Sequence, residues 1–308
     1  MTHDHAAAPG RAASRPFGRL LTAMVTPFTV DGSLDLDGAA RLATYLVKEQ
    51  GNDAVVVNGT TGESPTTTDA EKERLVRAVV EAVGDSARVV AGVGTNDTRH
   101  TIELAAAAEK AGAHGLLVVT PYYSRPPQSG LVRHFTAVAD ATGLPVMLYD
   151  IPHRSGVPIE TETLVRLAEH GRIVAVKDAK GDLTATSWVT SRTELAYYSG
   201  DDALTLPALA VGGVGLVGTS THFTGALTKQ MIEAYDKGDL TTALSVHRRL
   251  LPLFTGIFRT QGTILVKAGL AACGMPAGPV RPPLVDATDA EIVQLRADCA
   301  AAGLALPE

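Results

Sequence analysis

The chain has 308 residues, of which 45% are hydrophobic and 19% charged, and its formal net charge is −6. This length is enough for one large or two ordinary globular domains with a substantial apolar core. The negative charge and the lack of a basic run argue against nucleic acid as a partner. No apolar run approaches the ~20 residues that a membrane-spanning helix needs.

The two cysteines, Cys273 and Cys299, stand alone in the sequence, with no spacing typical of a metal site or a disulfide framework. A reducing compartment is the default for such a chain, so we expect a cytoplasmic location. Residues 1–17 are rich in Ala, Gly, Arg and Pro and lack the apolar centre of a secretory signal. We therefore expect a disordered N-terminal tail at 1–17.

From residue 20 onward, short apolar runs alternate with segments whose apolar residues recur at helical spacing. The apolar runs predict strands at 20–28, 53–58, 88–95, 115–123, 145–152, 173–177, 195–202 and 213–220. The segments between them predict helices at 34–50, 68–84, 98–111, 128–143, 160–171, 183–192 and 203–211. Thr68 and Glu71 have the spacing of a capping box at the start of the second helix.

Strict alternation of strands and helices indicates parallel strands joined by right-handed helical crossovers. Eight such units close a TIM (β/α)8 barrel, which we place at residues 18–230. Only helical patterns follow, so we expect a C-terminal helical extension at 231–308. An open doubly wound sheet is the alternative, but it favours a Gly-x-Gly-x-x-Gly turn after the first strand, and none follows Phe28.

Lys177 is the most informative residue of the chain. It follows the apolar run 173–176, which is typical of a strand buried on both faces, and so places an amine at the carboxyl end of a barrel strand. Burial disfavours the ammonium form, and a free amine can attack a carbonyl to form a Schiff base. A lysine that simply reaches solvent from a strand end is the simpler alternative for one residue taken alone.

The other predicted strand ends carry groups that suit carbonyl chemistry, since active residues of such barrels lie at the carboxyl ends of the strands. These residues are Thr60, Thr61, Tyr123, Tyr149 and Arg154. Hydroxyls of Thr60, Tyr123 and Tyr149 can both donate and accept protons, as a relay requires. The loop at Thr60 and Thr61 offers backbone N–H groups to a carboxylate, and Arg154 offers a bidentate fork to a second one.

Two other kinds of site deserve comparison with this one. A metal-dependent aldolase would need histidines at the strand ends, and His153 and His222 are too few and too far apart. Glycines at 212, 213, 215 and 218 could form a phosphate cradle, although a tight entry to the eighth strand explains them more simply. We therefore predict no metal site and no bound cofactor.

Several motifs occur in an order and spacing that resembles the dihydrodipicolinate synthase family of pyruvate-dependent Schiff-base aldolases. They are Gly59–Ser64, Thr120–Tyr123, Leu148–Pro152 with Arg154–Gly156, Val176–Ala179 and Ser199–Asp202. The likeness spans roughly residues 20 to 295.

This resemblance implies a 4-hydroxy-tetrahydrodipicolinate synthase activity in lysine and diaminopimelate biosynthesis. Pyruvate would form a Schiff base with Lys177, and its enamine would attack L-aspartate 4-semialdehyde. By position, Tyr149 would be the proton donor and Thr60 and Tyr123 its relay. The resemblance also implies a homotetramer, a dimer of dimers in which Tyr123 reaches the neighbouring subunit's site. Substrate contacts would come from Thr61, Arg154, Val217 and Gly200.

The chain departs from the family pattern at two places. Residues 218–222 after the eighth strand differ from the expected run, next to Val217, which could alter substrate choice. Lysine-inhibited members carry a histidine and a glutamate where this chain has Lys72 and His100, so we expect weak feedback by lysine. The remaining alternatives are a sister lyase acting on a 4-hydroxy-2-oxo acid or N-acetylneuraminate, and a non-catalytic barrel that binds a keto acid.

Overall fold

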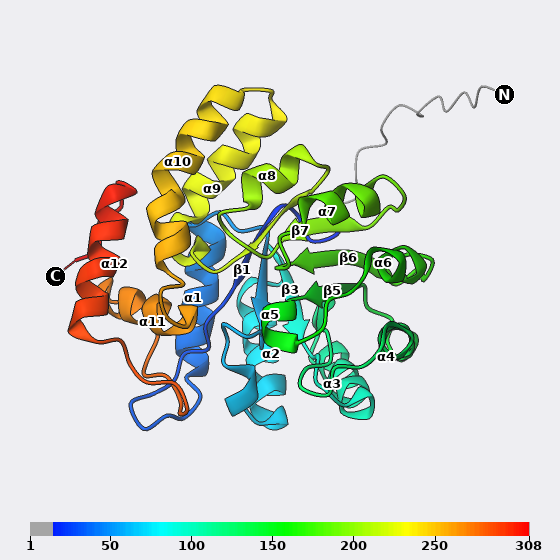
Figure 1. Cartoon of the computed structure of the whole chain (residues 1–308). Coiled ribbons are helices and arrows are strands. Elements are labelled where there is room, and N and C mark those ends of the chain that lie inside the picture. Colours follow the sequence, from blue (N-terminus) through cyan, green and yellow to red (C-terminus); the bar gives the residue numbers. More distant parts are fainter. Residues whose placement is uncertain (1–14, 308) are drawn as a thin grey trace.

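The structure is a computed structural model that describes residues 15–307. Eight parallel strands form a closed barrel in which each strand pairs with the next along the chain and the last pairs with the first (Figure 1). The strands are β1 (Leu20–Ala23), β2 (Ala54–Val57), β3 (Arg88–Gly92), β4 (Gly115–Val119), β5 (Val146–Asp150), β6 (Ile173–Asp178), β7 (Ala196–Ser199) and β8 (Gly215–Gly218). The predicted TIM barrel is therefore confirmed.

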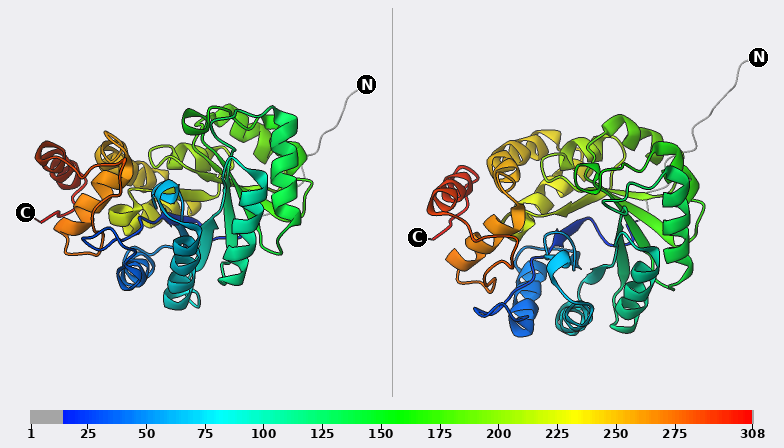
Figure 2. Two further views of the ribbon diagram at one scale, coloured as in Figure 1. Left: turned by 90° about the horizontal axis from the view of Figure 1, so that it is seen from below. Right: turned by 60° about the horizontal axis from the view of Figure 1, so that its bottom comes forward.

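Helices follow the strands and surround the barrel, and further C-terminal helices pack on one side, orange to red in Figure 2. The surrounding helices are α1 (Leu36–Lys48), α2 (Asp69–Val83), α3 (Thr98–Lys110), α4 (Gln128–Asp140), α6 (Thr161–Leu167), α7 (Leu183–Thr190), α8 (Thr205–Ala210) and α9 (Thr221–Asp236). The C-terminal helices are α10 (Leu240–Gly256), α11 (Gly262–Ala272) and α12 (Asp289–Ala301).

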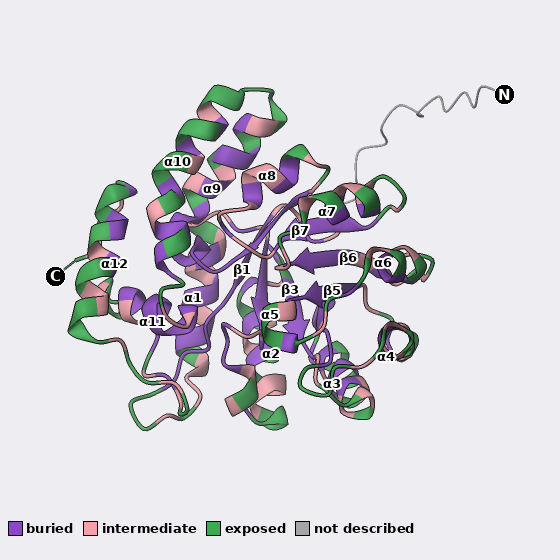
Figure 3. Ribbon diagram, in the orientation of Figure 1, coloured by how far each residue is buried: buried purple, intermediate pink, exposed green. Residues whose placement is uncertain are grey.

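Alternation along each strand divides the apolar residues into two buried layers. Residues such as Met147, Ala175 and Val217 fill the barrel interior, while Leu148, Val176 and Leu216 pack outward against the helices. Both faces of the strands are thus buried, while the outer faces of the helices and the loops meet solvent (Figure 3). This explains why the strands appear as continuous apolar runs in the sequence.

Local signals set the helix starts and the tight strand packing. The capping box of α2 is present, because the Thr68 side chain accepts from the Glu71 N–H and the Glu71 side chain accepts from the Thr68 N–H. At Gly215 an added Cβ would lie 1.9 Å from the carbonyl oxygen of Arg19. Glycine at 215 therefore lets the chain before β1 approach closely. This agrees with the tight entry to the eighth strand that the sequence favoured over a phosphate cradle.

Three expectations differ from the structure. Phe17, assigned to the tail, is 1% exposed and packs in the barrel interior, because its ring covers the amino-terminal end of the barrel; residues 1–14 of the predicted tail lie outside the described residues. The proposed boundary at residue 230 falls inside α9, the helix that completes the eighth unit. Two short elements, η1 (Ser64–Thr66) and α5 (Pro152–Ser155), have no counterpart in the sequence prediction.

Candidate active site

The carboxyl ends of β5 and β6 bring Tyr149 and Lys177 together inside the barrel. The two residues pair directly across the strands, and the Nζ atom of Lys177 lies 4.2 Å from the centroid of the Tyr149 ring. Both side chains are 5% exposed. An amine and a phenol are thus held side by side in a largely dry environment, the arrangement that proton transfer during imine formation requires.

The backbone after these two residues is anchored on the outer face of the sheet. Asp150 and Asp178 are also paired in register, and the Lys180 Nζ lies 3.0 Å from Oδ2 of Asp150. Asp178 accepts hydrogen bonds from the N–H groups of Lys180 and Gly181 and from the hydroxyl of Tyr197. Burial raises the pKa of Asp150, and the nearby Lys180 partly offsets that rise.

The loop after β2 presents two free amides. Within residues 15–307, the N–H groups of Thr60 and Thr61 donate to no protein acceptor, whereas those of Gly62 and Glu63 close turns onto the carbonyls of Gly59 and Thr60. Successive unpaired N–H groups at a strand-to-helix turn are suited to bind a carboxylate. The Thr61 hydroxyl lies 3.4 Å from that of Thr219, in the loop after β8.

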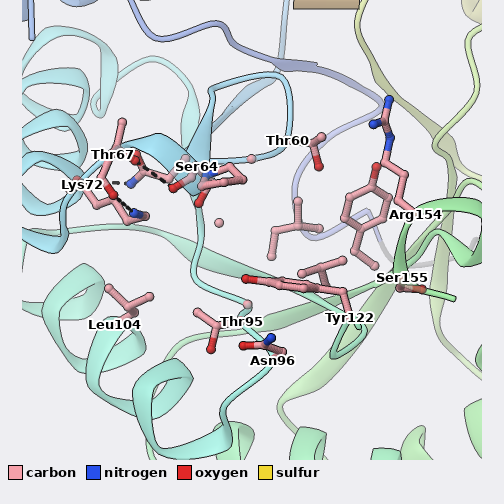
Figure 4. Close-up of a pocket in the computed structure, with 18 of the residues that line it drawn as sticks. Thr60, Ser64, Thr67, Lys72, Thr95, Asn96, Leu104, Tyr122, Arg154 and Ser155 are labelled. Carbon is pink, nitrogen blue, oxygen red and sulfur yellow. Dashed lines mark hydrogen bonds between the residues drawn. The ribbon is translucent and has the colours of Figure 1, made fainter. Parts of the chain in front are cut away.

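A cavity of about 450 Å³ opens at this end of the barrel (Figure 4). Thr60 and Arg154 lie at one end of it and Lys72 and Leu104 at the other (Figure 4), and Tyr149 is also part of its wall. Arg154 reaches the cavity because α5 turns the chain sharply after β5, from Pro152 to a glycine at 156 with a φ of 83°.

The remaining predicted residues lie around this cavity but not in its wall. Val217 is buried in the same interior cluster as Tyr149. Gly200 packs behind the lysine strand, where its N–H donates to the carbonyl of Asp178 at 2.6 Å. Tyr123 is 91% exposed, has a φ of 71° and does not line the cavity of its own chain, whereas its neighbour Tyr122 does.

The departure at residues 218–222 forms a buried polar network. Oδ1 of Asp202 accepts from the N–H and the hydroxyl of Ser220, and its Oδ2 accepts from the N–H of Thr219. His222 is fully buried; its Nε2 accepts from the Val25 N–H at 3.2 Å, and its Nδ1 lies 2.8 Å from the Thr219 carbonyl. Burial lowers the pKa of His222 to about 4, so this imidazole is neutral near pH 7.

Metal ligands are not gathered at this site. Across residues 15–307, no group of three or more His, Cys, Asp or Glu side chains is placed to hold a metal ion. His222 is bound to the backbone, and His153 lies on the exposed side of α5. The cavity wall also contains polar residues to which the sequence assigned no individual role, among them Asn58, Tyr122 and Ser155. Asn58 directly follows β2 and Tyr122 precedes Tyr123, so position after a strand end could have indicated both.

The closed (β/α)8 barrel with buried Lys177 beside Tyr149 at its carboxyl end has the arrangement that a carbonyl-condensing lyase needs. The model of the dihydrodipicolinate synthetase family matches residues 16–302, and the chain belongs to this family.

Individual relatives agree with this assignment. The chain is 73% identical over 288 residues to a 4-hydroxy-tetrahydrodipicolinate synthase of Acidothermus cellulolyticus, covering 94% of this chain and 93% of that protein. A crystal structure of DHDPS from Cyanidioschyzon merolae with lysine bound has a TM-score of 0.92 at 44% identity, covering 94% and 100% of the two chains. The chloride-inhibited enzyme of Acinetobacter baumannii complexed with pyruvate has a TM-score of 0.89 at 31% identity, covering 94% and 99%.

Proposed function

We propose that this protein is a 4-hydroxy-tetrahydrodipicolinate synthase, a lyase that condenses pyruvate with L-aspartate 4-semialdehyde in lysine and diaminopimelate biosynthesis. The observation that carries the proposal is the buried Lys177 amine 4.2 Å from the Tyr149 ring, at the mouth of the barrel. Membership of the family and 73% identity to a relative of that name support the particular substrates.

The chemistry would run through a covalent imine. The free amine of Lys177 attacks the keto carbon of pyruvate, and loss of water from the carbinolamine gives the Schiff base. Loss of a proton from the methyl carbon gives an enamine, whose carbon attacks the aldehyde and leaves an alkoxide that takes up a proton. The amino group of the second substrate then attacks the imine carbon, which closes the ring and releases Lys177.

Proton transfer in this scheme falls to hydroxyls. Tyr149 is next to the amine and serves as the donor, with Thr60 in the same cavity wall as its first relay partner. Tyr123 is exposed and strained in a left-handed conformation, as expected of a side chain that completes the relay of a neighbouring copy. A homotetramer built as a dimer of dimers is therefore part of the proposal.

Two different parts of the site would bind the carboxylates of the two substrates. The free N–H groups of Thr60 and Thr61 would bind the pyruvate carboxylate, while Val217 contacts its apolar face and Gly200 keeps room behind the lysine strand. Arg154 would bind the carboxylate of the aldehyde substrate through its guanidinium fork. This chemistry proceeds through the lysine imine, so we propose that the enzyme uses no metal or other cofactor.

The proposal also includes a cellular location. None of the helices within residues 15–307 is both long and apolar enough to cross a membrane. We propose that the protein acts in the cytoplasm, where its partners would be its small-molecule substrates and the other subunits of the homotetramer.

The test is borohydride reduction in the presence of pyruvate, followed by intact-protein mass spectrometry. We expect a single pyruvate-sized adduct that is lost in Lys177→Ala, and turnover when aspartate semialdehyde is added. An adduct without turnover would indicate a sister lyase for a 4-hydroxy-2-oxo acid or N-acetylneuraminate. A chain that forms no adduct would be a keto-acid-binding barrel, and the proposal would be wrong.

A further inference from the structure

Helix α11, in the C-terminal extension, contacts the carboxylate-binding loop from outside the barrel. Thr263 and Lys267 lie one turn apart on this helix and therefore share a face. The Thr263 hydroxyl donates to the carbonyl of Thr61 at 2.9 Å. The Nζ of Lys267 lies 2.6 Å from Oε1 of Glu63, two residues further along the same loop.

The charged pair at this contact is almost completely dry. The side chains of Lys267 and Glu63 are 3% and 1% exposed. Their remaining polar atoms are also bound: Nζ of Lys267 donates to the carbonyl of Pro279 at 2.8 Å, and Oε2 of Glu63 accepts from the N–H of Arg281 at 2.7 Å. Nζ also lies 4.2 Å from the centroid of the Phe28 ring.

Such a pair is a poor device for stability alone. Removing two charges from water costs about as much as their attraction returns, so apolar residues of similar volume would serve equally well. Glu63 also has a φ of 55°, a conformation that is unfavourable for a side chain other than glycine. The buried ion pair and the positive φ of Glu63 both carry a free-energy cost, and both lie in one loop. A requirement to hold this loop in one conformation would explain them.

The contacts fix which way the peptide groups of the loop face. Thr263 binds the carbonyl of Thr61, and the Thr26 hydroxyl binds the carbonyl of Gly62 at 2.6 Å. These two peptide groups carry the N–H groups of Gly62 and Glu63, which donate to the carbonyls of Gly59 and Thr60 at 3.1 Å. The carbonyls of Gly59 and Thr60 are therefore turned inward along the loop, and the N–H groups of Thr60 and Thr61 in the same peptide groups stay unpaired. The loop is thus held in the form that can accept a carboxylate.

We infer that Thr263 and Lys267 are positioning residues for the keto-acid substrate, acting through the backbone of residues 60–63. The C-terminal helices are then part of the catalytic unit, although they contribute no group to the reacting atoms. This inference rests on the proposed function, because it assigns the loop to the carboxylate of pyruvate.

The decisive comparison is between Thr263→Val and Thr263→Ser. Valine keeps the shape but loses the hydroxyl, and we expect the KM for pyruvate to rise about five-fold, the effect of one lost hydrogen bond, with a small change in kcat. Serine keeps the hydroxyl and should restore the wild-type KM. The KM for the aldehyde should not change in either variant.

Asp298→Asn is the matched control for a purely structural effect. It breaks the Arg259–Asp298 ion pair, which joins the segment before α11 to α12 and does not touch the loop. We expect this variant to lower Tm and leave the KM for pyruvate unchanged. If Thr263→Val behaves like Asp298→Asn, lowering Tm without raising the KM, the inference is wrong.

A second measurement tests the inference whether or not pyruvate forms an adduct with the protein. Hydrogen–deuterium exchange of the segment 58–64 should be faster in Thr263→Val and in Lys267→Met than in the wild type, and unchanged in Asp298→Asn. Lys267→Met leaves the carboxylate of Glu63 buried without its partner, which destabilises the fold. The double variant Glu63→Gln with Lys267→Met removes both charges, so it tests the loss of the ion pair in a protein that still folds. Exchange unchanged in all of them would overturn the positioning role, whereas a missing adduct in the wild type would overturn the proposed function.

Discussion

His222 makes the stability of this protein depend on pH. Its imidazole is neutral and fully buried, and burial lowers its pKa from 6.5 to about 4. The unfolded chain therefore binds a proton between these pH values while the folded chain does not, so the free energy of unfolding falls as the pH drops from 6.5 towards 4. The expected loss is about 3 kcal/mol for this one group.

Urea unfolding at pH 7 and at pH 4.5 would measure this effect. In His222→Gln, whose amide oxygen can still accept from the Val25 N–H, the loss of stability on acidification should be smaller by about 2 kcal/mol. His134, also buried with its pKa lowered to about 4, should account for part of the remainder. An equal loss of stability in the wild type and His222→Gln would contradict the assignment.

At the scale of elements, the sequence predicted more of the fold than of the contacts between distant segments. All eight strands and the capping box of α2 were predicted, because burial on both faces and a side-chain cap are local signals. The short turn of α5 was not, since four residues carry no periodicity. The contact of Thr263 with Thr61 joins residues 202 positions apart, and nothing in the local sequence encodes it.

The candidate site shows the same difference between features that the sequence predicted and features that depend on the assembled structure. The family predicted from the strand-end motifs is confirmed by the family match, and relatives with the name of the predicted synthase support the proposed activity. Strand register brings Lys177 beside Tyr149, as expected for neighbouring barrel strands. The roles of the individual residues stay predictions, and Tyr123 is the clearest case, because a single chain leaves it exposed.

The buried carboxylate of Asp150, the last residue of β5, forms an ion pair with Lys180 just after β6. Asp150 is fully buried and Lys180 is 15% exposed at the side chain, so Lys180→Met leaves a carboxylate without its partner. We expect a loss of about 3 kcal/mol in the free energy of unfolding, measured by urea titration at pH 7. Asp150→Asn combined with Lys180→Met should recover most of it.

A surface pair provides the control for this cycle. Arg192, in the turn after α7, pairs with Glu162 of α6 at 2.9 Å, but their side chains are 35% and 77% exposed. Arg192→Met should therefore cost less than about 0.5 kcal/mol, because solvent screens the pair. A similar loss of unfolding free energy in Lys180→Met and Arg192→Met would show that the Asp150–Lys180 ion pair contributes no more to stability than a surface pair.

At the scale of the whole molecule, the far end of the cavity bears on regulation. Lys72 and His100 line it together with Asp69, and Nε2 of His100 lies 2.9 Å from Oδ2 of Asp69. Asp69 thus places a carboxylate beside His100, while the Nζ of Lys72 donates to the carbonyl of Thr67 and has no acidic partner within residues 15–307. Lys72 remains the main positive charge that a cationic effector would meet.

We therefore predict that free lysine inhibits this enzyme weakly or not at all, because the Lys72 ammonium repels the ammonium groups of the ligand. Initial rates of condensation at increasing lysine concentration would measure this. Lys72→His combined with His100→Glu supplies the pair of residues found in lysine-inhibited members of the family and should make the enzyme sensitive, while Thr60 and Lys177 are untouched. Half-inhibition of the wild type by sub-millimolar lysine would refute the electrostatic argument. So would a double variant that stays insensitive while it still folds and turns over, since repulsion by Lys72 would then not be the reason.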